Sequence, residues 1–455
     1  SMQSQDPYSL DESKIIEPPK TLGKTLKHLG PGFILSASIV GSGELIATTV
    51  LGAKAGFVAM WVILVSCLVK VAVQLEFGKR AIMTGETTFA SFNSLPGPKL
   101  GKANWTVWTW LVLMLIKFLQ VGAIVGLVSV LLNMAFPGLS DFWWLIIVVI
   151  AISSIVVSGY YKILEVLSVS MIGLFTIFTF FSLIALQSTE SAISIANITS
   201  GLQFQIPEGA GMAIVVIGAF GLTGVGGDEI MAYNYWLIEK GYASNTGQND
   251  GTEEWNRRAK GWIKVMYIDA IFAMIVYTLV TVAFFLLGSA LLYGKGDFNV
   301  GGKAFLEDLS NLYTATLGGW AEPFFYFGAF VVLFSTAFSA LGAWTRQFTD
   351  AFGRVGLLDF DDFKSRRIWF GILAVVIPTL WALVHLLFQK PVWMIVVGGV
   401  STSIILLVVL FAAIVFKNQR KNSEIKTGGI YEVAFWLSSA MILFVGVWSI
   451  LSIYI

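Results

Sequence analysis

Eleven long apolar runs restrict this chain to a membrane-spanning, all-α fold. Each run is long enough to cross the hydrocarbon core of a bilayer as a helix, which takes roughly 17–25 residues. Only helices and closed barrels satisfy every backbone hydrogen bond in lipid, and runs of this length favour helices. The charged fraction of 13% also lies below the roughly 25% typical of soluble domains. The runs cover residues 30–52, 56–78, 105–136, 142–158, 163–187, 209–239, 262–292, 321–343, 367–388, 391–416 and 431–454.

Basic residues are distributed unevenly among the segments between these runs. With the N-terminus inside, 23 of the 29 Lys and Arg residues fall in inner segments and four in outer segments. Because positive charge is retained on the cytoplasmic side, we expect a cytoplasmic N-terminus and an outside C-terminus in a plasma or inner membrane. A tail of residues 1–29 then precedes a single polytopic domain, residues 30–455. The formal net charge of +1 gives no indication of a nucleic-acid partner.

Glycine interrupts the first and the sixth of these runs, and acidic residues follow each interruption. The first reads Gly41-Ser42-Gly43-Glu44, and the second runs from Gly221 to Gly227 and leads into Asp228 and Glu229. Irregular backbone at membrane depth is tolerated only where it lines a cavity or is buried in protein, and a carboxylate there marks a functional site by default. Two broken helices five helices apart are typical of transporters built from inverted repeats. We therefore expect 5+5 repeats at about 30–187 and 209–416, with an additional last helix at 431–454.

The candidate ligands near the two interruptions all carry oxygen. Hard oxygen sites suit magnesium, calcium or manganese better than zinc or copper. With one cysteine and two histidines in the chain, Cys clusters and His-rich metal centres are excluded. The alternative is that the acids only cap half-helices, where the helix dipole favours negative charge. The candidates are Glu44, Asp228, Glu229, Ser42, Thr223 and Asn234, together with backbone carbonyl groups around Gly41 and Gly224.

Lys117 lies in the middle of the third run, too deep to reach the interface. Such a buried charge is expected to pair with an acid, and Glu44 and Asp228 are the obvious partners. The lysine neutralises an empty site, stands where a coupling ion would sit, or forms a structural salt bridge. In the second run, Lys70 and Gln74 share a helix face and approach the inner end.

Several segments resemble the NRAMP family of divalent-metal transporters. GSGE at 41–44 aligns with that family's DPGN motif, and GAFGLTGVGGDEI at 218–230 occupies the place of its GATVMPHN break. GPGF at 30–33, YKILEVLSV, KVMYIDA and TRQFTDAFG look similar as well. The resemblance implies a LeuT-type fold, a monomer in the lipid bilayer, and a divalent cation as substrate without any cofactor.

The departures from the family pattern indicate a different ligand set. The family's metal-binding Asp falls on Gly41, its Asn on Glu44 and its methionine ligand near Leu222. An Asp–x–x–Glu pair linked to proton transfer falls on Lys117 and Gln120, so proton coupling of the usual kind is not expected. The pattern is similar to an NRAMP-related branch that transports magnesium, which dehydrates reluctantly and prefers oxygen ligands.

These observations lead to one expected function and one alternative. We expect a divalent-cation transporter for magnesium or manganese that works by alternating access, with Glu44 and Asp228 as central ligands. The alternative is a LeuT-fold transporter of a small organic solute such as an amino acid or amine, because glycine-rich breaks also receive carboxylates. No phosphate loop, nucleophile motif or HExxH pattern occurs, so an enzyme is not expected.

Overall fold

The computed structural model describes residues 5–295, 302–452 and 454, without the side chains of residues 42–44. Almost all regular structure is helical, and one short hairpin pairs β1 (Lys99–Leu100) with β2 (Ala103–Asn104). The helices are η1 (Glu12–Lys14), α2 (Leu22–Leu26), α3 (Pro31–Val40), η2 (Gly41–Ala47), α4 (Thr48–Ala55), η3 (Gly56–Ala59), α5 (Met60–Val69), α6 (Val71–Thr84), α7 (Thr88–Phe92), α8 (Trp105–Ala135), α9 (Asp141–Val156), α10 (Tyr161–Leu186), α11 (Ile195–Gly201), α12 (Met212–Leu222), α13 (Gly227–Lys240), α14 (Tyr242–Thr246), α15 (Glu253–Leu292), α16 (Gly302–Leu317), α17 (Ala321–Val355), α18 (Phe363–Phe388), α19 (Pro391–Arg420) and α20 (Gly429–Leu451).

Helices cover every apolar run identified in the sequence. Within the described residues, nine helical runs are long and apolar enough to cross a membrane. One of them, Pro31–Thr84, contains two of the predicted segments and turns at Gly56, whose φ is +71°. The helix α9 is apolar but shorter. The prediction of an all-α membrane protein is therefore confirmed.

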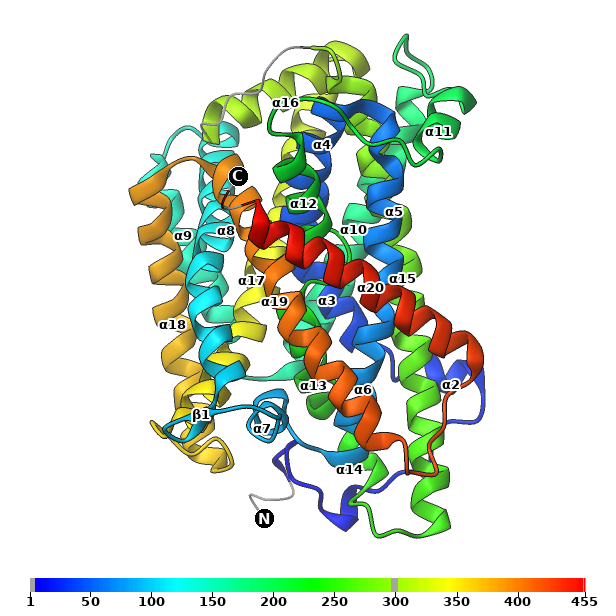
Figure 1. Cartoon of the computed structure of the whole chain (residues 1–455). Helices are drawn as coiled ribbons and strands as arrows, with labels where there is room; N and C mark the ends of the chain where they lie inside the picture. The colour runs from blue at the N-terminus through cyan, green and yellow to red at the C-terminus, as the bar shows by residue number, and fades with distance from the viewer. Residues whose placement is uncertain (1–4, 296–301, 453, 455) are drawn as a thin grey trace.

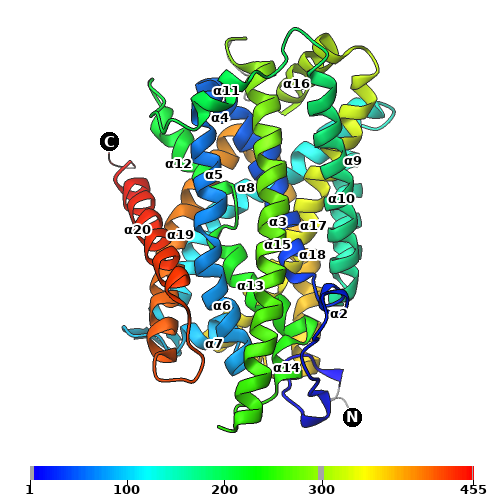
Figure 2. The same ribbon diagram turned by 90° about the vertical axis from the view of Figure 1, so that its right-hand side faces the viewer.

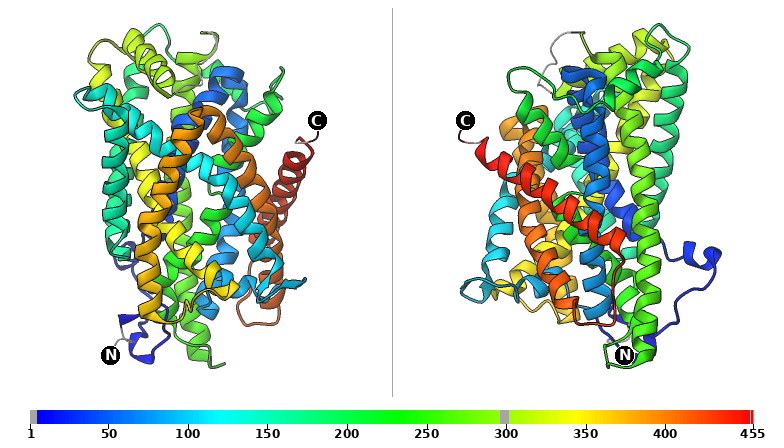
Figure 3. Two further views of the ribbon diagram at one scale, coloured as in Figure 1. Left: turned by 90° about the vertical axis from the view of Figure 1, so that its left-hand side faces the viewer. Right: turned by 45° about the vertical axis from the view of Figure 1, so that its right-hand side comes forward.

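The helices form an upright bundle with distinct ends and an external last helix. The short helices α7 and α14 lie at the end that carries the N-terminus, whereas α11 and α16 lie at the opposite end (Figures 1 and 2). The helix α19 packs against both halves, α12 and α13, whereas α17 packs against α13, and α8 packs against α17 and α19. The last helix, α20, crosses the outside of the bundle obliquely against α19 (Figure 3).

Glycine allows α12 and α19 to approach each other unusually closely. A methyl group at Gly221 would overlap the carbonyl oxygen of Gly399, and one at Gly399 would come within 2.8 Å of the Leu222 side chain. Small residues at such crossings let helix backbones touch in the absence of a hydrophobic driving force. The end of α12 is thereby fixed against the middle of α19.

The first predicted interruption is a π-helical segment and not an extended break. The segment η2 continues α3 into α4 without leaving the helical conformation. The hydroxyl of Thr336 on α17 accepts from the Gly41 N–H at 2.6 Å and donates to the Ala37 carbonyl at 3.0 Å. A side chain inserted between a helical N–H and its usual partner widens the turn. The prediction that the first helix is broken was therefore wrong, because the backbone stays helical. The regular pattern of helical hydrogen bonds is nevertheless disrupted at Gly41, where the prediction placed the break.

Candidate functional site

The sixth predicted segment is interrupted between α12 and α13, as the sequence predicted. After Leu222 the backbone becomes extended at Thr223, with φ −92° and ψ 145°, and α13 begins at Gly227. Gly224 has a φ of +67°, and a Cβ added there would lie 2.8 Å from the Ser66 carbonyl oxygen. Only glycine combines this left-handed conformation with so close an approach. The break therefore exposes carbonyl groups at the end of α12 and N–H groups at the start of α13.

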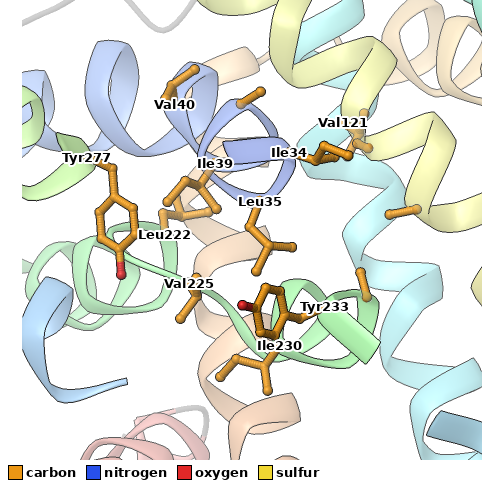
Figure 4. Close-up of a cluster of buried hydrophobic side chains, with 14 of the residues drawn as sticks. Ile34, Leu35, Ile39, Val40, Val121, Leu222, Val225, Ile230, Tyr233 and Tyr277 are labelled. Carbon is orange, nitrogen blue, oxygen red and sulfur yellow. The ribbon is translucent and has the colours of Figure 1, made fainter. Parts of the chain in front are cut away.

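Apolar side chains cover one side of this break. Leu35 and Ile39 on α3 lie beside Leu222 and Val225 (Figure 4). All four side chains are buried, with exposed fractions of 4% or less. In such surroundings an unpaired polar group is costly, so the freed backbone groups need partners within the protein.

Lys70 supplies the partner at the α12 end of the break. Its ammonium group donates to the Thr223 carbonyl at 2.7 Å and also to the Phe220 carbonyl. The Ser66 hydroxyl is within 2.8 Å of the same two carbonyl oxygens. Lys70 is fully buried, and its contact with the break was not predicted from the sequence. The missed signal was its position well inside an apolar run, where an ionisable residue marks a functional site.

Lys117 supplies the partner at the α13 end. Its ammonium group lies 2.6 Å from Asp228 Oδ1, and both side chains are buried. The Asp228 carbonyl accepts a hydrogen bond of 2.6 Å from the Gln347 side chain on α17. The prediction that Lys117 pairs with an acid is confirmed, and Asp228 is that acid.

Glu229, the second acidic residue of α13, interacts with Asp228 through its carboxyl group but has one carboxyl oxygen without a hydrogen-bond partner among the described residues. Within the part of the chain that the structure describes, its Oε2 atom is buried and accepts no hydrogen bond. It lies against Gly226, where a Cβ would overlap this oxygen, and it interacts electrostatically with Lys70 and Lys117. The two acids of α13 and the two lysines thus balance one another in charge.

The remaining predicted residues divide between the break and the helix packing around it. The Thr223 hydroxyl donates to the Ala219 carbonyl at 2.7 Å, which leaves the Thr223 carbonyl as the group turned to Lys70. Gln120 packs against Gly398 of α19. The side chains of Ser42 and Glu44 lie outside the described residues, whereas Gly41 lies in η2 beside α17.

Asn234 connects α13 to α7 and takes no part in the break. Its side-chain oxygen accepts from the Thr88 N–H at 3.0 Å, and its amide nitrogen donates to the Glu86 carbonyl at 2.8 Å. Both ends of the amide are therefore occupied by backbone groups, and this position favours a structural role. Among the described side chains, no group of three or more His, Cys, Asp or Glu residues is placed to hold a metal ion.

Ion pairs close the bundle at the end that carries the N-terminus. Arg346 on α17 makes a bidentate pair with Glu239 on α13, at 2.9 and 3.0 Å, and also donates to the Gly159 carbonyl. Tyr8 of the N-terminal tail donates to the same glutamate at 2.5 Å. Asp269 accepts from the N–H groups of Gly30 and Gly32, at 2.9 and 2.8 Å. The tail, α13, α15 and α17 are thereby joined below the break.

Comparison with solved structures places the fold among LeuT-type membrane proteins. A manganese transporter of Eremococcus coleocola superposes with a TM-score of 0.72 over 98% of this chain and 91% of its own, at 14% identity. MhsT, solved in complex with L-phenylalanine, gives a TM-score of 0.54 at 17% identity, covering 92% of this chain and 98% of its own. At these identities the likeness concerns the fold alone.

Sequence comparison identifies the family. An uncharacterised protein of Pasteurella multocida is 27% identical over 336 residues, which is 70% of this chain and 69% of that protein. A divalent metal cation transporter MntH of Listeria innocua is 25% identical over 301 residues, which is 66% of this chain. The match spans 62% of the length of the Listeria protein. The sequence profile described as natural resistance-associated macrophage protein-like matches residues 32–452. The chain therefore belongs to the Nramp family.

Proposed function

We propose that this chain transports divalent metal cations, magnesium and/or manganese, by alternating access. The relatives named above include divalent metal cation and manganese transporters, and the donors around the break are oxygen atoms. The proposal includes eleven membrane-spanning helices, of which ten form two inverted repeats of five and the last is additional, with the N-terminus in the cytoplasm. The cation is the substrate and not a resident cofactor.

The observation that carries the proposal is the pair of carboxylates beside backbone released from helical hydrogen bonding. Asp228 and Glu229 stand in the first turn of α13, and the carbonyl group of Thr223 lies at the other side of the break. Hard divalent cations bind such mixtures of carboxylate and carbonyl oxygen. We assign Asp228 and Glu229 as ligands, with Glu44, Thr223 and the carbonyl groups around Gly41 and Gly224 assisting.

Lys117 competes electrostatically with the cation for Asp228. In the described state it holds Asp228 at 2.6 Å, so a cation that binds Asp228 has to displace this ammonium group. In the empty site Lys117 neutralises Asp228 in place of the metal, and the loaded site needs Lys117 to move away. Since Lys117 and Gln120 stand where acids would be needed, this exchange proceeds without the family's usual proton pair.

Uptake into liposomes tests the proposal. Purified protein is reconstituted with an internal metal-sensitive dye and supplied with Mg²⁺, Mn²⁺ or Ca²⁺, and calorimetry is run in parallel on the same preparation. Glu229→Gln removes a ligand charge and is expected to abolish saturable uptake, whereas Glu208→Gln, an exposed residue, leaves uptake unchanged. No saturable flux and no saturable heat with any of the three ions would refute the assignment.

One observation favours a small organic solute as the second candidate. A cation would be attracted to two positions of the break, the end of α12 and the first-turn carboxylate of α13. A lysine ammonium group already binds at each of them. A zwitterionic amino acid would leave that balance of charge unchanged. A panel of amino acids and amines in the same calorimetric assay separates the candidates, because only this second function gives heat without a divalent ion.

A further inference from the structure

A basic pocket lies outside the transport pathway, where α19 ends and α20 begins. It has a volume of about 720 Å³. The end of α19 and the start of α20 lie towards the end of the bundle that carries the N-terminus (Figure 1). Lys417, Arg420, Lys421 and Lys426 contribute to its lining, and Glu432 is its one acidic residue. The lining therefore carries a net charge of about +3 at neutral pH.

Most of this positive charge is not neutralised inside the pocket. Lys417 pairs with Glu432 at 2.6 Å, and Arg420 pairs with Glu76 of α6 at 2.5 Å. Lys421 and Lys426 are exposed, and the structure's ion pairs among described residues include neither of them. The pocket thus has two exposed ammonium groups outside any ion pair of the described residues, beside two cations that are already paired.

Arg420 provides the buried donor that marks this pocket as a binding site. Its side chain is only 9% exposed, and its Nε–H is buried without a hydrogen-bond acceptor among the described residues. A buried donor without a partner is unfavourable, so an incoming acceptor oxygen would be stabilised here. The guanidinium group is already fixed by Glu76 and by the Ile425 carbonyl, and this fixes the direction of the free N–H.

The other wall of the pocket is apolar and continues along the outside of the bundle. Trp436 of α20 lines the pocket and is half exposed, and Val433 and Leu437 beside it are 62% and 63% exposed. In a membrane protein such residues face lipid, and tryptophan concentrates at the headgroup level. A ligand here would meet cations at one end and acyl-chain surroundings at the other.

We propose that this pocket binds the phosphate headgroup of an anionic glycerophospholipid. The phosphate oxygens would accept from Lys421, Lys426 and the free N–H of Arg420, while the acyl chains lie along Trp436 and the outer face of α20. Basic pockets between helices on one side of a membrane bind anionic headgroups in this way. The lipid would fasten α20 to α19 and, through Arg420 and Glu76, to α6.

The test measures lipid-dependent stability of the full chain in detergent. Phosphatidylglycerol, phosphatidylcholine and inorganic phosphate are titrated separately, and the shift in melting temperature is recorded. Phosphatidylglycerol is expected to give a saturable rise, and Lys421→Ala/Lys426→Ala is expected to weaken its binding roughly thirtyfold, since each surface cation contributes comparably to anionic lipid attraction. Lys20→Ala/Lys364→Ala changes two exposed lysines elsewhere and keeps the wild-type response.

Three outcomes would overturn the proposal. Equal shifts with phosphatidylcholine would remove the role of the anionic headgroup, and an equal shift with inorganic phosphate would make the pocket a site for free phosphate. An unchanged response in Lys421→Ala/Lys426→Ala would place the lipid elsewhere. Arg420→Lys, which retains charge but removes the Nε–H, gives a second check by lowering affinity while Glu76 keeps a cationic partner.

Discussion

Replacing Lys117 by methionine is the sharpest perturbation of the proposed site. The variant removes the ammonium group that lies 2.6 Å from Asp228, with 2% and 6% of the two side chains exposed. Removing one partner of a buried ion pair typically costs about 3–5 kcal/mol, because the remaining charge stays buried. Glu229 lies in the next position of the same turn and also interacts with Lys117, so the variant would leave two neighbouring buried carboxylates without this ammonium group.

The assay is unfolding of the purified protein in mixed micelles, with chelator or with a divalent cation. We expect Lys117→Met to lower the free energy of unfolding by about 3–5 kcal/mol in chelator. A cation that binds the freed carboxylates would restore stability by linkage, by about 2.7 kcal/mol at a free concentration one hundred times its Kd. The Lys117→Met/Asp228→Asn double variant removes the stranded charge and is expected to recover stability without metal.

A surface pair provides the matched control. Lys303 and Glu307 lie 3.9 Å apart with side chains 60% and 49% exposed, so Lys303→Met is expected to cost about 1 kcal/mol or less. If Lys117→Met lowers the free energy of unfolding by no more than Lys303→Met does, Lys117 does not compensate the buried charge of Asp228. If its stability is also independent of Mg²⁺ and Mn²⁺, the carboxylates are not a cation site.

Three further changes test the surroundings of the break. Gly224→Ala places a Cβ 2.8 Å from a backbone oxygen at φ +67°, and calorimetry should record a larger loss of stability than for Gly251→Ala, where φ is +74° but nothing lies within 4 Å. Lys70→Met leaves two buried carbonyl groups without their ammonium donor, and is expected to cost about 1–3 kcal/mol and to abolish uptake; wild-type uptake would contradict a role in the break. Glu239→Gln weakens the bidentate pair with Arg346 at the N-terminal end of the bundle. It should accelerate maleimide labelling of Cys67, the single cysteine of the chain, which is buried. An unchanged labelling rate would show that this pair does not control access to the interior.

The sequence predicted most of the fold because the bilayer imposes simple rules on it. Apolar length fixes where helices lie, and each predicted run is helical apart from the break between α12 and α13. The break before Asp228 was predictable because four of the seven residues from Gly221 to Gly227 are glycine. Glycine destabilises a helix, so such a cluster inside an apolar run indicates an interruption. The pairing of Lys117 followed from the cost of an isolated charge in lipid.

The errors arise where a long-range contact decides between local alternatives. Gly41 begins a π-helical turn because Thr336, 295 residues further along the chain, inserts its hydroxyl at that point. No pattern around Gly41 reveals that contact. Asn234 looked like a ligand from its distance to Asp228 along the chain, but its amide is used by α7. Only Lys70 was locally predictable, because an ionisable residue well inside an apolar run indicates a functional site.

The two lysines change how the break should be understood. A broken helix attracts cations at the carbonyl end of its first half and at the carboxylates that begin its second half. Here Lys70 occupies the first of these positions and Lys117 the second, so two lysines face the two carboxylates of α13. Lys70 is bonded to backbone at the α12 end, whereas Lys117 is bonded to a side chain that can rotate. A divalent cation bound as proposed would therefore compete with Lys117 and not with Lys70.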